Sequence, residues 1–297
     1  MSNLPQELFI IYNPQSTGNS EANAVQLAEQ LKAAQDFEAD IHIICSERDG
    51  GTEDVAYALA MSAPKALIIS SSGDGGYNEV INGALRAKHE GADPICGLLP
   101  SGNANDHYRN LHSGPIVGQI IKGKHRSIDV LQITGTRDGK PWQRLAHSYI
   151  GVGLTPKVGR ELNKVQLNRF REAWIVVRTL YKLRGSRLVV RGRERTYDSL
   201  IFSNVGKMSK ILNLSDLSKL EDGKFEIIAF PSRTRLQLLW QLVRATTVGL
   251  HTERQARSYS FSTIAPTSIQ LDGEVYQLDG HSQVKVSLLP RTLKCII

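Results

Sequence analysis

The sequence lacks several features by which common classes of protein are recognised. No run reaches the roughly 18 uninterrupted apolar residues that cross a bilayer. The amino terminus has neither a basic segment nor a small-residue cleavage pattern, so no secretory signal is expected. The three cysteines, Cys45, Cys96 and Cys295, are far apart in apolar surroundings, which excludes a disulfide framework and a zinc site. Their number and spacing favour reduced core thiols in a cytoplasmic protein. The P-loop pattern G-x-x-x-x-G-K-[ST] is also missing, which argues against that class of nucleotide-binding protein.

The length and composition indicate a globular protein with two domains. The chain has 297 residues, of which 41% are hydrophobic and 22% charged. Its net charge of +7 is unevenly distributed, because residues 157–195 contain twelve Lys or Arg and three acidic residues. Such a basic stretch is compatible with nucleic acid, an anionic membrane or a phosphorylated substrate, or with an ordinary solvated surface.

The first 125 or so residues alternate short apolar runs with helical patterns. A buried strand is predicted at residues 8–12, and further strands are predicted at residues 40–45, 66–70 and 95–100. Each is followed by a helical pattern; the first begins at Ser20, an expected N-cap, and has Ala24, Leu27, Ala28 and Leu31 on one face. Alternation of this kind predicts an α/β domain in which a Rossmann-like parallel sheet is covered on both faces.

After about residue 128 the pattern changes to short β-rich segments separated by turn residues. This spacing predicts a mainly antiparallel β-sandwich or barrel, interrupted by helical inserts at about residues 165–184 and 235–248. We therefore expect one domain over residues 1–128, with residues 290–297 packing back onto it, and a second domain over residues 129–289.

Residues 72–76, SGDGG, lie between a predicted strand and a predicted helix. Glycines there allow positive φ and bring amide N–H groups close to an oxyanion, to which the helix N-terminus adds its partial positive charge. Asp74 would repel a bare phosphate, so it requires magnesium or a hydrogen-bonded network nearby. Taken alone, the pattern fits a phosphate-binding loop and an ordinary strand-to-helix turn equally well.

Further segments make the sequence similar to a known family. The GDG loop and the N-E-V-I-N-G that begins at Asn78 resemble the signature of the diacylglycerol kinase catalytic domain, whose superfamily includes sphingosine and ceramide kinases. NPQSTGNS, from Asn13, resembles the family's nucleotide loop, and PSGNAND, from Pro100, resembles its next conserved segment. KLEDGKFEII and SIQLDGEVY follow in the expected order, so the resemblance extends over nearly the whole chain.

The resemblance implies an ATP-dependent lipid kinase with the fold of NAD kinases and lipid kinases, which uses magnesium and phosphorylates a hydroxyl of a lipid such as diacylglycerol. In such a reaction the protein mainly positions the reactants and offsets charge. The resemblance places ATP against Asn13, Thr17, Gly18, Ser46, Gly73, Asp74, Gly75, Gly76, Asn78, Glu79 and Asn103. It implies that Asp74 and Asp106 organise the magnesium and that Glu274 is the general base. It also implies a second metal at Asp222 and the carbonyls of Lys219 and Lys224.

Three departures from the family pattern concern the nucleotide loops. Gly76 and Asn103 replace threonines that are common in the family, and His107 stands where phenylalanine is common. Ser72, in SGDG rather than GGDG, resembles sphingoid-base kinases, whereas Asn105-Asp106 is typical of the bacterial diacylglycerol kinases. The retained carboxylates favour an active enzyme.

The alternatives are a sphingoid-base or other lipid kinase, an NAD kinase-like enzyme, and a non-catalytic lipid- or nucleotide-binding regulator. A membrane lipid substrate requires peripheral docking of a cytoplasmic protein, for which residues 157–195 could supply contact with an anionic membrane surface. No nucleic-acid partner is expected, because no recognised binding motif accompanies the basic stretch. The sequence is compatible with a homodimer and does not fix the oligomeric state.

Overall fold

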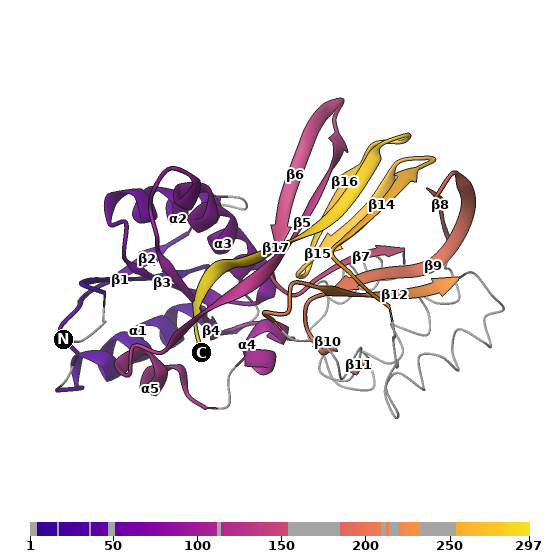
Figure 1. Ribbon diagram of the computed structural model, residues 1–297. Helices are drawn as coiled ribbons and strands as arrows, with labels where there is room; N and C mark the ends of the chain where they lie inside the picture. The colour runs from indigo at the N-terminus through magenta and orange to yellow at the C-terminus, as the bar shows by residue number, and fades with distance from the viewer. Residues whose placement is uncertain are drawn as a thin grey trace. The chain divides into compact units, whose positions relative to one another are not determined.

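A computed structural model describes residues 5–16, 18–35, 37–46, 51–111, 114–153, 185–208, 212–213, 220–231 and 254–297. The chain divides into two compact units (Figure 1). The first unit consists of Met1–Asp129 and Pro290–Ile297, and the second of Val130–Leu289. The helical inserts predicted at about 165–184 and 235–248 lie outside the described residues.

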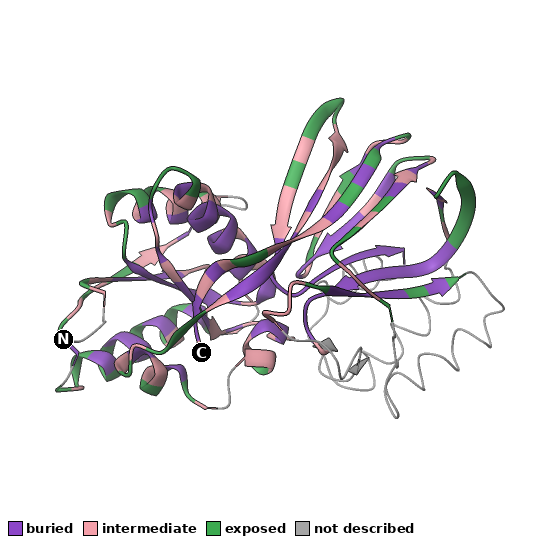
Figure 2. Ribbon diagram, in the orientation of Figure 1, coloured by how far each residue is buried: buried purple, intermediate pink, exposed green. Residues whose placement is uncertain are grey.

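The first unit is built on a parallel sheet. Its strands are β1 (Glu7–Tyr12), β2 (Asp40–Cys45), β3 (Leu67–Ser72) and β4 (Ile95–Pro100), in the order β2-β1-β3-β4. Beyond β4, the last residues of β17 (Gln283–Ile296) pair in parallel, with Cys295 opposite Cys96. The inner strands are apolar on both faces and lie among the buried residues of Figure 2, because helices cover both sides of the sheet.

Five helices flank this sheet. They are α1 (Ser20–Lys32), α2 (Gly51–Ser62), α3 (Asp74–His89), α4 (Asp106–Leu111) and α5 (Ile116–Ile121). Helices α1 and α5 lie on one face of the sheet, and α2 and α3 on the other (Figure 1). The face of α1 that the sequence predicts as apolar is buried against the sheet. The prediction that Ser20 is the N-cap is wrong: Asn19 holds that position, and Ser20 Oγ instead donates to the carbonyl of Asn13 at 2.5 Å.

Charged side chains hold the C-terminal residues onto the first unit. Lys294 Nζ donates to the Asp93 carboxylate, which also lies 3.7 Å from Lys88 Nζ. Lys88 Nζ in turn donates to the carbonyl of Thr292 at 2.8 Å. Partial burial by itself would raise the pKa of Asp93, but the hydrogen bond and the charge of Lys294, aided by Lys88, lower that pKa below its ordinary value.

The second unit is antiparallel. Its strands are β5 (His125–Arg137), β6 (Lys140–Ala146), β7 (Tyr149–Gly153), β8 (Ser186–Val190), β9 (Arg193–Ser203), β10 (Lys207–Met208), β11 (Leu212–Asn213), β12 (Phe225–Pro231), β13 (Gln255–Ala256), β14 (Ser258–Thr263), β15 (Thr267–Leu271), β16 (Glu274–Leu278) and the first part of β17. Most of them are connected in the order β16-β15-β7-β9-β8-β14-β17-β5-β6, with β12 paired to β9 and β13, whereas β10 and β11 pair with each other in a separate two-stranded sheet. The side chains of these strands enclose one apolar core around Phe202, which contacts Phe225, Tyr259 and Phe261.

The chain thus has parallel strands in its first unit and antiparallel strands in its second, as the sequence predicts. Strands β5 and β17 begin in one unit and end in the other. Among the residues that the structure describes, none of the helices combines the length and the apolar character needed to span a membrane.

Candidate active site

The predicted nucleotide loops lie at the carboxyl edge of the parallel sheet. Strand β1 lies between β2 and β3. The chain therefore passes from β1 to β2 at one edge of β1, and then crosses to β3 at its other edge. The order of strands reverses at this point, and in open α/β sheets ligands bind there, outside the carboxyl ends of the strands. The loop after β1 contains Asn13 and Gly18, and the loop after β3 contains Gly73. The fold therefore brings these two motifs to the edge where a ligand is expected.

The backbones of three loops touch at this edge. The Gly18 N–H donates to the carbonyl of Ser101 at 2.9 Å, and the Ser101 N–H donates to that of Ser72 at 2.8 Å. A Cβ atom on Gly102 would lie 2.4 Å from the Cα atom of Gly73, and one on Gly18 would lie 2.6 Å from the Ser101 carbonyl oxygen. Both distances are too short for any side chain. Glycine is therefore required at positions 18 and 102 for the loops after β1, β3 and β4 to pack together.

A cluster of buried polar side chains supports these loops from beneath. Ser71 Oγ donates to the carbonyl of Ser20 at 2.7 Å and lies 3.1 Å from Ser101 Oγ. Asn23 Nδ2 donates to Ser101 Oγ at 2.8 Å, which ties α1 to the loop after β4. Sequence reasoning missed this cluster. The sequence feature that could have revealed it is the run of three serines at residues 70–72. These serines end a buried strand that is otherwise apolar.

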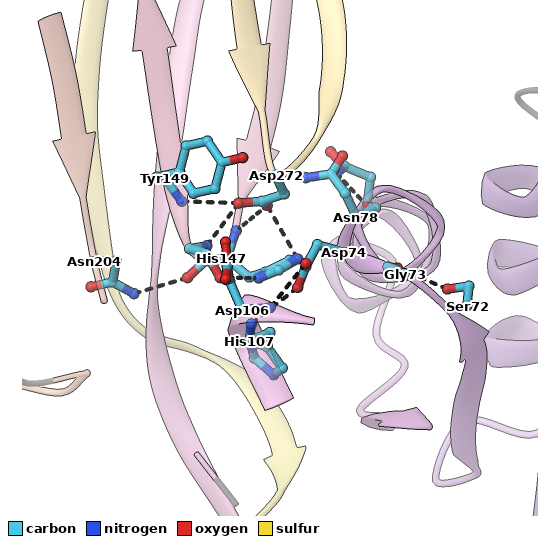
Figure 3. Close-up of polar contacts among 12 residues, drawn as sticks. Ser72, Gly73, Asp74, Asn78, Asp106, His107, His147, Tyr149, Asn204 and Asp272 are labelled. Atoms are coloured by element: carbon cyan, nitrogen blue, oxygen red, sulfur yellow. Dashed lines mark hydrogen bonds and ion pairs between the residues drawn. The ribbon is translucent and has the colours of Figure 1, made fainter. Parts of the chain in front are cut away.

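Asp74 joins the glycine loop to helix α4. It is the first residue of α3, and its carboxylate accepts the backbone N–H groups of Asp106 (2.9 Å) and His107 (3.0 Å) (Figure 3). Charge-assisted bonds of this kind satisfy donors that the first turn of a helix leaves unpaired. The structure thus brings Asp74 and Asp106 together, through the backbone of Asp106, and provides the hydrogen-bonded network that a carboxylate in this loop requires. Their role toward magnesium stays a prediction.

Asn103, the predicted nucleotide contact in the loop after β4, is held in place by a neighbouring asparagine. Asn105 has a φ of 52°, a region that Asn tolerates better than most residues. Its side chain accepts the Gly102 N–H at 3.0 Å and donates to the Gly102 carbonyl at 2.9 Å. These two bonds close a short loop in which Asn103 is exposed. Asn105 therefore fixes the position of Asn103, a role that the sequence did not reveal.

The remaining predicted nucleotide residues lie around the ends of β1 and β2 and in the first turns of α3. Asn13 Oδ1 accepts the N–H of Gln15 at 2.8 Å, which forms a turn directly after β1. Ser46 follows β2 and donates, from its hydroxyl, to the carbonyl of Tyr12 at 3.1 Å. A hydrogen bond with the Cys45 thiol, aided by partial desolvation, raises the pKa of Tyr12 to about 12.

Four further residues predicted to contact ATP lie in the first two turns of α3. Gly75, Gly76 and Glu79 are partly exposed, whereas Asn78 is buried and accepts a bond from Asn82 Nδ2 at 3.2 Å. Thr17, also predicted to contact ATP, lies outside the described residues.

Glu274 lies in the second unit, at the start of β16, where it is exposed. The turn that precedes it has φ values of 48° at Asp272 and 106° at Gly273, the positive values that a two-residue hairpin turn requires. The turn therefore directs the chain from β15 into β16 and fixes the backbone at Glu274.

Asp272 anchors this turn. Its fully buried carboxylate accepts the backbone N–H groups of His147 (2.7 Å), Ser148 (2.9 Å) and Tyr149 (2.9 Å), and one of its oxygens lies 3.3 Å from His147 Nε2 (Figure 3). It thus ties the β15–β16 turn to the junction of β6 and β7. Sequence reasoning missed the role of Asp272, although the residue directly precedes Gly273-Glu274.

The second predicted metal site is a turn around Gly223, which has a φ of 71°. Asp222 Oδ1 accepts the Lys224 N–H at 3.0 Å, and Lys219 lies outside the described residues. Within the described parts of the chain, no group of three or more His, Cys, Asp or Glu side chains is arranged as a metal site. A metal at Asp222 stays a prediction.

Comparisons with known proteins agree with this arrangement. Residues 7–133, which contain all three loops of the first unit, match the family model of the diacylglycerol kinase catalytic domain. This part of the chain is therefore similar to diacylglycerol kinase catalytic domains. The prediction of the family is confirmed, and so is that of the enzyme class, a kinase that phosphorylates an alcohol group.

Individual proteins and solved structures extend the similarity over most of the chain. The diacylglycerol kinase of Staphylococcus saprophyticus is 24% identical over 289 residues, which cover 89% of this chain and 88% of that protein. The crystal structure of a diacylglycerol kinase from Bacillus anthracis superposes with a TM-score of 0.70, at 18% identity, over 98% of this chain and 96% of that one. Yeast NADH kinase, at 10% identity, has a TM-score of 0.53 over 99% of this chain and 84% of its own. The predicted fold of NAD kinases and lipid kinases is therefore confirmed.

Proposed function

We propose that the protein is an ATP-dependent lipid kinase, which transfers the γ-phosphate of ATP to a hydroxyl group of a membrane lipid such as diacylglycerol. The observation that carries this proposal is the packing of the family's three loops against one another at the carboxyl edge of the parallel sheet. In this proposal the first unit binds ATP and the second binds the lipid.

The residues at the carboxyl edge fit a magnesium-bound nucleotide. Side chains at positions 18 and 102 would separate the loops, so glycine there keeps backbone amides close to any phosphate that binds between them. Asn13, Thr17, Gly18 and Ser46 would border the nucleotide, and residues 73–76 with Asn78, Glu79 and Asn103 would hold its phosphates. Bound magnesium would neutralise charge on the transferred phosphoryl group. Asp106, whose position Asp74 fixes through two hydrogen bonds, would orient that ion.

Glu274 is proposed to accept the proton of the lipid hydroxyl. An alcohol is a weak nucleophile, and a carboxylate within hydrogen-bond reach can remove its proton as the phosphoryl group arrives. The anchoring of the preceding turn by Asp272 supports this role, because a general base must be held in one position.

A lipid substrate also requires a surface that docks on the membrane. Most of the basic segment 157–195 lies outside the described residues, but its last part forms the β8–β9 hairpin. There Arg187, Arg191, Arg193 and Arg195 are exposed, and Glu194 pairs with Arg187. We propose that this hairpin contacts anionic lipid headgroups. Reversing the charge of Arg191 and Arg193 together should weaken binding to vesicles with anionic lipid at least about tenfold. Reversing the exposed Lys32 and Lys65 of the first unit should not.

The kinase proposal is tested by incubating the full chain with γ-labelled ATP, magnesium and a panel of lipids that includes diacylglycerol and sphingoid bases, with NAD as a further acceptor. Glu274→Gln should lower kcat at least about a hundredfold with little change in the KM for ATP. Glu38→Gln, the same change on an exposed residue of the first unit, should leave kcat unaltered.

Each outcome of this assay bears on one part of the proposal. Labelling of a sphingoid base in place of diacylglycerol would change the substrate and keep the lipid kinase. Labelling of NAD alone would refute the proposal that the protein is a lipid kinase. Undiminished labelling of lipid by the Glu274→Gln variant would refute the role of Glu274 as general base. Binding of ATP with no acceptor labelled would favour a non-catalytic regulator.

A further inference from the structure

Ser72 and Gly76 share one small space beneath the phosphate loop. Ser72 is the last residue of β3 and is 3% exposed, and Gly76 lies in the first turn of α3. A Cβ atom on Gly76 would lie 2.7 Å from Ser72 Oγ and 2.8 Å from Ser72 Cβ. Real Cβ atoms do not approach other heavy atoms this closely. The serine side chain therefore fills the space that any side chain at position 76 would need.

The clash cannot be relieved by turning the serine. Rotation about χ1 moves Oγ but leaves Cβ in place, and Cβ is itself within 3.0 Å of the added atom. Ser72 Oγ also has two partners of its own. It lies 2.7 Å from Ser70 Oγ. It donates to the carbonyl of Gly73 at 3.0 Å (Figure 3). The end of β3 or the start of α3 would have to move; these elements flank Gly73, and α3 begins with Asp74.

We propose that Ser72 is a positioning residue of the phosphate loop, and that glycine at position 76 is there to accommodate it. The hydroxyl of Ser72 holds the Gly73 carbonyl, and its Cβ packs against the first turn of α3. In this way Ser72 sets the direction of the amides that face the triphosphate of the nucleotide. The inference rests on the proposed ATP site and adds a residue to it.

A double-mutant cycle on the full chain tests the pairing. Alanine in place of an exposed helical glycine normally stabilises a protein, because glycine is a poor helix former. The Gly76→Ala change should therefore lower the melting temperature when Ser72 is present and raise it in the Ser72→Gly background. Equal shifts of the melting temperature in both backgrounds would overturn the steric pairing. Gly118→Ala in α5, where an added Cβ has no atom within 4 Å, should raise the melting temperature in either background.

Binding of magnesium-ATP, measured by titration calorimetry, tests the positioning role. Gly76→Ala should weaken binding at least tenfold, Ser72→Gly several-fold, and the double variant no more than Ser72→Gly alone. In kinase assays these changes should raise the KM for ATP more than they lower kcat. Unaltered ATP affinity in the Ser72→Gly and Gly76→Ala single variants would overturn the positioning role, even if the melting temperatures confirm the pairing.

The two readouts separate this inference from the proposed function. If the unmodified chain binds no ATP, the proposed function and the positioning role both fail, whereas the melting temperatures still decide whether Ser72 and Gly76 exclude each other. If the unmodified chain binds ATP and the changes are additive, the inference fails and the ATP site stands.

Discussion

Replacement of Asp272 by asparagine removes a charge from the interior of the second unit while it keeps the size of the side chain and the tolerance for positive φ. The aspartate accepts two backbone N–H groups on Oδ1, from Ser148 and Tyr149, and a third on Oδ2, from His147. In the variant, the amide oxygen can still accept the first two bonds. The amide nitrogen would then face the N–H of His147, so that two donors oppose each other. Flipping the amide is worse, because two backbone donors would then face the nitrogen.

The magnitude follows from these contacts. A buried donor left without an acceptor costs about 1–3 kcal/mol, and two hydrogen bonds to a carboxylate lose roughly 1 kcal/mol in total when the acceptor becomes neutral. The free energy of unfolding of the second unit should therefore fall by about 3 kcal/mol.

Equilibrium unfolding in guanidinium, followed by tryptophan fluorescence and by circular dichroism, measures this loss; all three tryptophans of the chain belong to the second unit. Asp279→Asn is a matched control, because Asp279 also accepts two backbone N–H groups, those of Asp138 and Gly139, but at the protein surface. There water can replace the lost acceptor, and the cost should stay below about 1 kcal/mol. A loss below 1 kcal/mol for Asp272→Asn would show that the carboxylate does not anchor the turn.

Three other predictions concern the first unit. Gly102→Ala should weaken magnesium-ATP binding at least about tenfold, since its Cβ would push Gly73 away; unchanged affinity in a titration would refute this. A lowered pKa means that Asp93 stabilises the fold above its ordinary pKa of 3.8, and that this contribution is lost as pH falls through the lowered value. Asp93→Asn should therefore destabilise the protein by less than about 1 kcal/mol at pH 7, and this loss should shrink as pH falls below 3.8; a loss that stays constant with pH in denaturant titrations would contradict the ion pair. Burial raises the pKa of Cys96 to about 12, so iodoacetamide at pH 8 should modify Cys45 in the native protein and Cys96 only after unfolding, as peptide mass spectrometry would show.

The regular part of the fold could be predicted because its signals are local. Apolar runs such as residues 66–70 and 95–100 need only their own sequence to indicate buried strands, and the period of α1 needs only Ala24, Leu27 and Leu31. The position of the first two nucleotide loops then follows, because the carboxyl ends of parallel strands meet at one edge. The cap of α1 could not be predicted in this way, since Ser20 binds the backbone of Asn13 in the preceding loop instead of its own helix.

The contacts within the candidate site could not be predicted, because their partners are distant in sequence. Asp74 bonds to backbone groups 32 and 33 residues away, and Asp272 to groups 123–125 residues away. Every donor in these bonds is a backbone N–H group. Because all residues except proline have such a group, no pattern of residue types in the sequence marks the donors. The exclusion between Ser72 and Gly76 joins residues only four positions apart, yet it depends on the angle at which β3 leads into α3.

The glycine loop after β3 shows where sequence and tertiary structure each decide. By itself the sequence determined that a strand ends and a helix begins around Asp74, and that glycines there permit close approach to an anion. Only the tertiary structure decided that Asp74 binds α4, that Gly73 lies against Gly102, and that Ser72 leaves no room at Gly76. The reason is physical: propensity and periodicity act between neighbours along the chain, whereas hydrogen-bond partners and steric exclusion depend on how separate elements pack.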